Sequence, residues 1–239
     1  MGISLAANSG VSCAVLRSSH ILISQTMMQQ HDTSPTSRPL LTPVTNWIAL
    51  SGVSCSGKTS TGLELVRLGY ERIPETMRVW MDGLKSQGAE ISELKKADPL
   101  SFRRDLFEVA HGIGESLVPR YANERMFFTR PGIDALAFMK ADGLPYELER
   151  ERMSRSFRFS LVCVFDPLPF VPDGTRVNNP EYRIRLHEAL LQVCDELGYS
   201  GTSLLRVPAY SPDGATLTIE DRAKLIVDGL PKMANVEAP

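Results

Sequence analysis

The chain lacks a strong excess of charge of either sign. Its 239 residues include 26 Lys and Arg against 28 Asp and Glu, which gives a formal net charge of −2. A general nucleic-acid-binding surface needs a basic excess or a basic stripe. The balance therefore predicts no general nucleic-acid partner, and it disfavours a kinase that acts on nucleic acid without excluding one.

Paired cysteines and long apolar runs are also missing. The cysteines are Cys13, Cys55, Cys163 and Cys194. None belongs to a C-x-x-C pair, so their spacing predicts neither a zinc site nor a disulfide framework. Reduced thiols favour an intracellular setting; we expect the cytoplasm, with import into an organelle through the N-terminal extension as the alternative. No apolar stretch is long enough to span a membrane, since Arg17 and His20 interrupt the most apolar early segment.

The first 45 residues differ from the rest in composition. They are rich in Ser and Thr, contain the single acid Asp32, and hold three prolines between positions 32 and 43 without any periodicity. We predict a disordered extension or linker over 1–45. A cleaved transit peptide also fits the Ser-rich, acid-poor composition, although arginines are few. A natural start at Met27 or Met28 is a third interpretation. The folded domain is expected to span 46–239.

A phosphate-binding loop is the most informative motif of the chain. Residues 52–59, GVSCSGKT, match the Walker A pattern G-x-x-x-x-G-K-[ST]. The apolar run before the loop, from about residue 47 to 50, predicts a buried strand, and residues 60–68 predict a helix. In that setting the backbone N–H groups of the loop and the helix N-terminus bind nucleotide phosphates. A Gly-rich turn that matches by chance is the alternative.

The motif predicts a binding site for ATP, or GTP, together with Mg²⁺. The predicted nucleotide-binding residues of the loop are Gly52, Val53, Ser54, Cys55, Ser56, Gly57, Lys58, Thr59 and Ser60. The Lys58 ammonium is expected to reach the β- and γ-phosphates, and the Thr59 hydroxyl is the predicted metal ligand.

Strands and helices alternate along the rest of the chain. The predicted strands lie near 70–73, 125–129, 159–165 and 204–207, and the predicted helices near 74–85, 99–118, 133–140, 145–156, 180–197 and 219–230. This alternation predicts an α/β fold with a parallel sheet covered by helices on both faces. Ligands of such sheets bind at the carboxyl ends of the strands. The segments that follow the strands are therefore the places to look for function.

Glu75 and Arg78 follow the predicted second strand. A carboxylate at this place faces the bound phosphates, where it can accept a proton from an acceptor hydroxyl or hold a substrate. The alternative is an acid that complements the dipole of the helix it begins. Arg78 lies one helical turn further on and is positioned to pair with Glu75. Both are predicted substrate-binding residues.

Arg130 and Asp134 follow the predicted third strand. The Arg130 guanidinium can bind an oxyanion of the substrate. Asp134 either serves the site or simply begins the next helix, and the sequence leaves both open.

A Pro- and Gly-rich loop follows the fourth strand, and we interpret it as a lid. Arg176 in this loop is predicted to close over the nucleotide and to stabilise charge on the transferred γ-phosphoryl group. Arg183 fits either a nucleotide contact or a solvated position, and Arg185 fits a solvated helix. His111 and His187 are expected at core or boundary positions, and the charged segment 147–158 is expected to be a solvated helix face with internal pairs.

Several short motifs occur together in one order. They are Cys55-Ser56-Gly57-Lys58-Thr59, Ile73-Pro74-Glu75 with Arg78, Phe128-x-Arg130-x-Gly132-x-Asp134, Pro167-Leu168-Pro169 with Asp173-Gly174-x-Arg176, and Leu186-His187 with Leu197-Gly198-Tyr199. Over about residues 46–230 the chain resembles the AAA-type P-loop ATPases related to the kinase domain of NadR, a nicotinamide-riboside kinase. The resemblance implies a kinase-like, three-layer α/β/α P-loop NTPase fold, binding of ATP or GTP with Mg²⁺, and phosphoryl transfer to a small molecule.

The chain departs from this family at the end of the third strand, which usually reads Phe-Asp-Arg-Gly. Thr129 takes the place of the acid, and Pro131 stands before Gly132. An acid there would help to hold Mg²⁺, directly or through water. Glu75 or Asp166 must then serve in its place, or metal affinity and turnover fall.

Two functions follow from these residues. The first is a small-molecule kinase, in which Lys58 and Arg176 stabilise the transferred phosphoryl group and Glu75 positions or deprotonates the acceptor. The second is a nucleotide-dependent switch or binding module with little or no turnover. Thr129 favours the switch, whereas an acceptor pocket built from Glu75 and Arg130 favours the kinase. An oligomeric motor is disfavoured, because the chain has no room for an extra helical lid domain.

Overall fold

The computed structural model of the chain describes residues 42–169 and 179–234. The predictions for most of the N-terminal extension and for Arg176 lie outside these residues. All of the described residues belong to one unit, Leu41–Pro239. No helix in the described part of the chain is long and apolar enough to cross a membrane.

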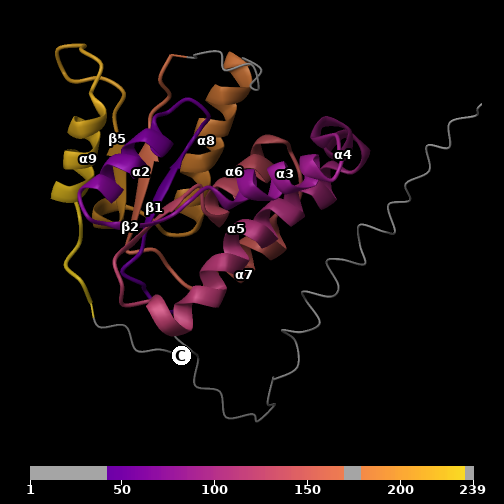
Figure 1. Cartoon of the computed structure of the whole chain (residues 1–239), viewed down its shortest axis with the longest axis horizontal. Helices are drawn as coiled ribbons and strands as arrows, with labels where there is room; N and C mark the ends of the chain where they lie inside the picture. Colours follow the sequence, from indigo (N-terminus) through magenta and orange to yellow (C-terminus); the bar gives the residue numbers. More distant parts are fainter. Residues whose placement is uncertain (1–41, 170–178, 235–239) are drawn as a thin grey trace, which may run out of the picture. The chain divides into compact units, whose positions relative to one another are not determined.

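A parallel sheet forms the centre of the described fold (Figure 1). Its strands are Ile48–Gly52 (β1), Glu71–Ile73 (β2), Met126–Thr129 (β3), Leu161–Phe165 (β4) and Leu204–Val207 (β5). They pair in the order β2-β3-β1-β4-β5, and every pairing is parallel. Strands β1 and β4 are buried along their whole length, which is why they are almost continuously apolar. The predicted parallel sheet is confirmed.

Helices connect and cover the strands. Their bounds are Lys58–Arg67 (α2), Thr76–Ser86 (α3), Ile91–Ala97 (α4), Pro99–Tyr121 (α5), Gly132–Ala141 (α6), Glu147–Ser156 (α7), Pro180–Glu196 (α8) and Ile219–Asp228 (α9). A 3₁₀ turn, Gly201–Ser203, precedes β5. Each predicted helix is found with small shifts at its ends. The sequence did not predict α4, a seven-residue helix with no fully buried side chain. Its Ile91 and Leu94 are partly buried and pack against the core.

Alternate residues of each strand face opposite layers of helices. In β1, Ile48 and Leu50 pack in a cluster with Leu65 of α2 and Ile226 of α9. Ala49 belongs to the larger cluster formed with α5, α6 and α8. Figure 1 shows α2 and α9 on one side of the sheet and α5, α6 and α8 on the other. This three-layer α/β/α arrangement follows from the two-residue period of the strands, and it confirms the predicted fold class.

Two helices begin where their sequence predicts. The Asp98 side chain accepts a hydrogen bond from the Ser101 N–H at 2.9 Å, directly before Pro99 at the first position of α5. The Asn179 side chain caps α8 in the same way, through the Tyr182 N–H at 2.9 Å. Each such cap stabilises its helix by about 1 kcal/mol. Proline at the first helical position costs no hydrogen bond, which explains both starts.

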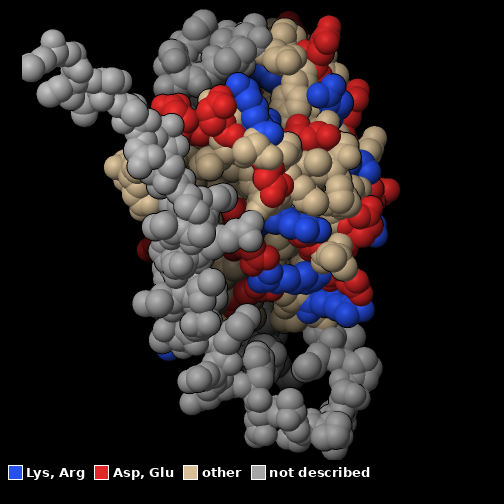
Figure 2. Space-filling view, turned by 90° about the vertical axis from the view of Figure 1, so that its right-hand side faces the viewer, with Lys and Arg blue, Asp and Glu red and all other residues tan. Residues whose placement is uncertain are grey.

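The charged helix α7 pairs mainly with its neighbour α5. Arg152 forms ion pairs with Glu108 and Glu115, and Arg104 pairs with Glu149 at 2.7 Å. The sequence predicted pairs within the helix, and Arg155–Glu151 is one of these. Figure 2 shows basic and acidic side chains interspersed on the face that it draws. The charges of α7 thus pair with a second helix as well as within α7.

Candidate functional site

The phosphate loop joins β1 to α2 and is shaped by its two motif glycines. Gly52 has a φ of 149°, and a Cβ atom there would lie 3.0 Å from the Phe165 carbonyl oxygen. Gly57 has a φ of 84°, and its Cβ would lie 2.6 Å from an Arg222 nitrogen. Both φ values favour glycine, and a side chain at Gly52 would in addition be tight against the backbone of β4. Cys55 also has a positive φ, of 56°, which is uncommon for a residue other than glycine.

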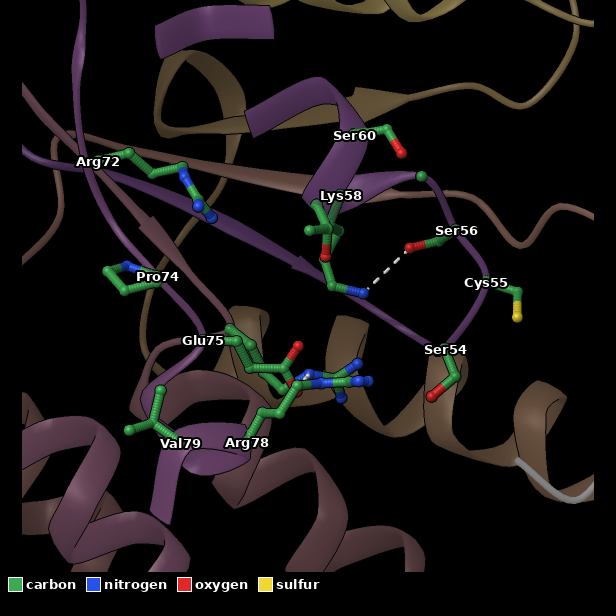
Figure 3. Close-up of a pocket in the computed structure, with 13 residues that line it drawn as sticks. Ser54, Cys55, Ser56, Lys58, Ser60, Arg72, Pro74, Glu75, Arg78 and Val79 are labelled. Carbon is green, nitrogen blue, oxygen red and sulfur yellow. Dashed lines mark hydrogen bonds and ion pairs between the residues drawn. The ribbon is translucent and has the colours of Figure 1, made fainter. Parts of the chain in front are cut away.

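The Lys58 ammonium lies inside the loop. It donates hydrogen bonds to the carbonyl oxygens of Gly52 at 2.6 Å and Val53 at 2.7 Å, and to the Ser56 hydroxyl at 3.1 Å. Figure 3 shows the bond to Ser56. Only 4% of Lys58 is exposed. These three bonds match the three N–H donors of the ammonium, so a phosphate must replace one of these acceptors in order to bind Lys58.

A pocket of about 430 Å³ opens beside the loop. The residues that line it are Ser54, Cys55, Ser56, Gly57, Lys58, Thr59, Ser60, Arg72, Pro74, Glu75, Arg78, Val79 and Arg130. Figure 3 shows Arg72, Glu75 and Arg78 gathered around the same space as Lys58. The carboxyl ends of β1, β2 and β3 meet at this edge of the sheet, and that topology brings the three segments together.

Glu75 and Arg130 form an ion pair in the lining of the pocket. The Arg130 Nε lies 2.9 Å from a Glu75 carboxylate oxygen, and both side chains are largely buried. Arg130 has a φ of 55°, a left-handed conformation that costs about 1–3 kcal/mol for a non-glycine residue. Its N–H donates to the Leu50 carbonyl at 3.0 Å, and its guanidinium stacks 5.4 Å from the Phe138 ring centre. Strain of this kind is concentrated at functional sites.

The sequence allowed Arg78 to pair with Glu75, and this pair stays a prediction. The structure places Arg130 in an ion pair with Glu75. Arg78 is exposed on the first turn of α3 and lines the pocket. Because the pairing crosses from the end of β2 to the end of β3, helical spacing did not reveal it.

Asp134 lies buried beneath the phosphate loop. Its Oδ1 accepts a hydrogen bond from the Gly52 N–H at 3.1 Å, and its second oxygen has no hydrogen-bond partner among the described residues. Burial raises the pKa of Asp134, and the nearby charges of Arg130 and Lys58 oppose that rise. The sequence left open whether this acid serves the site or begins a helix. It stands in the first turn of α6 and also supports the loop.

Arg222 of α9 supports the loop through a hydrogen bond, and the sequence analysis did not single it out. Its guanidinium donates to the carbonyl oxygens of Ser56 and Ala209, at 3.2 Å each, and 3% of the residue is exposed. The contact joins residues 166 positions apart. Nothing in the local sequence of α9 predicts it.

Arg183, at the start of α8, does not line the pocket. It donates to the Leu168 carbonyl at 2.7 Å, and the Leu168 N–H in turn donates to the Cys55 carbonyl at 3.3 Å. Arg183 is therefore linked to the phosphate loop through the segment that leads into the predicted lid. The predicted nucleotide contact of Arg183 stays a prediction, as does that of Arg176.

Thr129 accepts a hydrogen bond from an arginine that the sequence analysis did not single out. Arg72 of β2 donates from Nη1 to the Thr129 hydroxyl at 3.1 Å, and it lines the pocket. The space for both is left by Gly62 of α2, since a Cβ at Gly62 would meet the Arg72 side chain at 3.0 Å. Arg72 lies in a short strand whose carboxyl end is at the edge of the sheet where ligands bind. A charged residue at such a position could have been singled out from the sequence.

The residues around the loop do not fit a Mg²⁺ ion anchored by the protein. Mg²⁺ prefers carboxylate oxygens, phosphates and water. Of the described residues that line the pocket, Glu75 is the one acid, and it is paired with Arg130. Asp166 does not line the pocket and pairs with Arg206 at 2.7 Å. The described residues include no cluster of three His, Cys, Asp or Glu side chains that could hold a metal. Thr59 lines the pocket, but Thr129 at the end of β3 is bonded to the Arg72 guanidinium and is no acid.

Comparisons with known proteins agree with this architecture. Residues 47–208 match the family described as AAA domain. The structure of NadR in complex with NR is similar, with a TM-score of 0.57 and 19% identity over 81% of this chain and 52% of NadR. Deoxyadenosine kinase from M. mycoides gives a TM-score of 0.55 and 15% identity over 77% of this chain and 98% of that chain.

Thymidylate kinase from Ehrlichia chaffeensis gives a TM-score of 0.50 and 15% identity, with the same shares covered. No curated protein matches the chain. The chain spans about half the length of NadR, and at these identities the likeness shows the fold alone. The family match covers most of the chain, so this protein belongs to the AAA domain family and has the three-layer fold of the P-loop kinases.

Proposed function

We propose that this protein is a small-molecule kinase, which binds ATP at the phosphate loop and transfers its γ-phosphoryl group to a hydroxyl beside Glu75. GTP is the alternative nucleotide. One observation carries the proposal: the phosphate loop and the Glu75–Arg130 ion pair line the same pocket. A bare nucleotide switch has no need of a largely buried Glu–Arg ion pair in the lining of its nucleotide pocket.

Each residue of the pocket has a role in this reaction. The loop N–H groups and Lys58 hold the triphosphate and stabilise charge on the transferred group. Glu75 accepts the proton of the acceptor hydroxyl as its oxygen forms a bond to the γ-phosphorus, and ADP leaves with the electrons of the broken P–O bond. Arg130 keeps the Glu75 carboxylate oriented through their 2.9 Å ion pair. Thr59 stays the predicted contact for an ion that arrives with the nucleotide, and Arg176 and Arg183 stay predicted lid contacts.

A nucleoside-type acceptor is the first class to test. NadR has been solved with NR, and deoxyadenosine kinase with dCMP and dCDP. The exposed Arg78 and the half-buried Arg72 add two cations to the acceptor side of the pocket. An acceptor with hydroxyl or anionic groups complements these side chains.

A nucleotide-dependent switch with little turnover is the second candidate. The observation that favours it is Thr129, which is hydrogen-bonded to Arg72 at the strand end where an acid would help to hold a metal. In this case nucleotide binding would order a partner-binding segment, and slow hydrolysis would reset it.

Acceptor-stimulated release of ADP by the purified chain tests the proposal. ATP consumption is measured alone and with a panel of nucleosides that includes NR. We expect one acceptor to stimulate ADP release, and Glu75→Gln to lower that rate by about 10²-fold or more while ATP still binds, because general base catalysis is worth that much. Glu124→Gln, a change at an exposed acid near β3, is the matched control and should leave the rate unchanged.

Two outcomes would contradict the kinase. Equal rates of acceptor-stimulated ADP release in wild type and Glu75→Gln would show that Glu75 does not act as the base. Tight ATP binding without turnover, whatever the acceptor, would favour the switch.

A further inference from the structure

The described pocket is rich in positive charge and poor in acids. Lys58, Arg72, Arg78 and Arg130 line it, against the single acid Glu75. Arg130 is paired with Glu75, so among the described lining residues no second acid lies beside Arg72 and Arg78. Other P-loop NTPases hold Mg²⁺ with the loop Ser or Thr and an acid at the end of a neighbouring strand. In this chain the corresponding strand end carries Thr129.

Arg72 is held where its charge can serve the phosphate site. Its guanidinium donates to the Thr129 hydroxyl at 3.1 Å, and Thr129 is only 2% exposed. The aliphatic part of the Arg72 side chain lies close to Gly62 of α2, where a Cβ atom would be 3.0 Å from it. Both contacts restrict the side chain, and Arg72 lines the same pocket as Thr59. A guanidinium has five donors and keeps its charge at every accessible pH, so the bond to Thr129 leaves donors for phosphate oxygens.

We propose that the Arg72 guanidinium, anchored on Thr129, binds the nucleotide phosphates in place of an acid-anchored metal ion. It follows that the protein binds ATP almost as well without Mg²⁺ as with it. A divalent cation at this strand end would be repelled by Arg72, whereas metal-free ATP carries more negative charge for Lys58 and Arg72 to bind. The inference rests on nucleotide binding at the phosphate loop, which is the first step of the proposed function.

Calorimetric titration with ATP, in Mg²⁺ and in EDTA, tests this inference. For the wild-type chain we expect the two affinities to agree within about threefold, less than 1 kcal/mol. In EDTA the ATP affinity of Arg72→Met should be lower than that of wild type by about tenfold or more, because a charge-assisted hydrogen bond to phosphate is lost. Arg120→Met, at an exposed arginine near the end of α5, is the matched control and should bind like wild type.

Two further variants keep the test independent of the folding of Arg72→Met. In Thr129→Asp the new carboxylate pairs with Arg72 and reduces the charge it offers, so ATP affinity in EDTA should fall. In the double variant Arg72→Met with Thr129→Asp, the acid is available to a metal, and Mn²⁺ binding to the ATP complex, followed by electron paramagnetic resonance, should become tighter than in wild type. Unchanged ATP affinity in EDTA for Thr129→Asp would overturn the role of Arg72.

The outcomes separate this inference from the proposed function. If the wild-type chain binds ATP in Mg²⁺ and its ATP affinity falls by more than about tenfold in EDTA, the inference is wrong and the proposed kinase function is unaffected. A chain that binds no ATP under either condition would overturn both.

Discussion

Two turns at the same edge of the sheet are built in different ways. The loop after β1 takes its conformation largely from its own residues, although Asp134 and Arg222 support it from other segments. Gly52 and Gly57 supply the backbone conformation, and Lys58 bonds to carbonyls five and six positions earlier. The turn after β3 depends on other segments, since Arg130 pairs with Glu75 and Thr129 bonds to Arg72. The loop thus depends mainly on a local motif, whereas the turn after β3 depends on contacts with residues far away in the sequence.

The largest expected effect lies in the loop. Lys58→Ala removes the ammonium at its centre, and we expect ATP affinity to fall by about 10²-fold or more, with loss of turnover. Lys224→Ala is the control, because Lys224 pairs with Asp228 on the exposed surface of α9. Titration with ATP measures the effect. Unchanged affinity and turnover in Lys58→Ala would contradict the assignment of the phosphate site.

A smaller effect on ATP affinity is expected from Arg222, which bonds to the loop from α9. Arg222→Met keeps the apolar stem but removes two donors, which leaves the Ser56 and Ala209 carbonyls without these bonds. We expect the unfolding midpoint to drop and ATP affinity to fall by about tenfold, because an unsatisfied buried group costs about 1–3 kcal/mol. Thermal unfolding and ATP titration should be run on the same sample. A lower midpoint with full ATP affinity would show that Arg222 stabilises the fold without shaping the loop.

The smallest expected effect concerns pH and the acid below the loop. Burial raises the pKa of Asp134, so the folded state keeps a proton that the unfolded state has released. Stability therefore falls as pH rises from the unfolded pKa of Asp134 through its higher folded pKa. Asp134→Asn keeps an oxygen for the Gly52 N–H and removes this titration.

Denaturant unfolding of both proteins between about pH 4 and pH 8 measures the difference. Relative to wild type, Asp134→Asn should gain on the order of 1 kcal/mol across that range. A difference that stays constant with pH would show that Asp134 titrates alike in the folded and unfolded states.

The comparison of the two turns also explains what the sequence could predict. The strands, most helices and the phosphate loop follow from periodicity, capping residues and one motif, each of which acts over a few positions. Arg72 and Arg222 were missed because their roles depend on residues 57 and 166 positions away. Glu75 and Arg130 were predicted to serve the site, but their pairing depends on the order of the strands. Asp134 stayed ambiguous because a helix start and a buried support for the loop require the same residue type.

Mass analysis of the acceptor tests the central claim most directly, namely that one pocket brings a nucleoside triphosphate and a hydroxyl acceptor together. The protein is incubated with ATP and each nucleoside of the panel, and both products are analysed. We predict that one acceptor gains a single phosphoryl group in step with ADP formation, and that Glu75→Gln forms neither product at a comparable rate. ADP and inorganic phosphate at the same rate with every acceptor unmodified, or ATP left intact, would contradict the account.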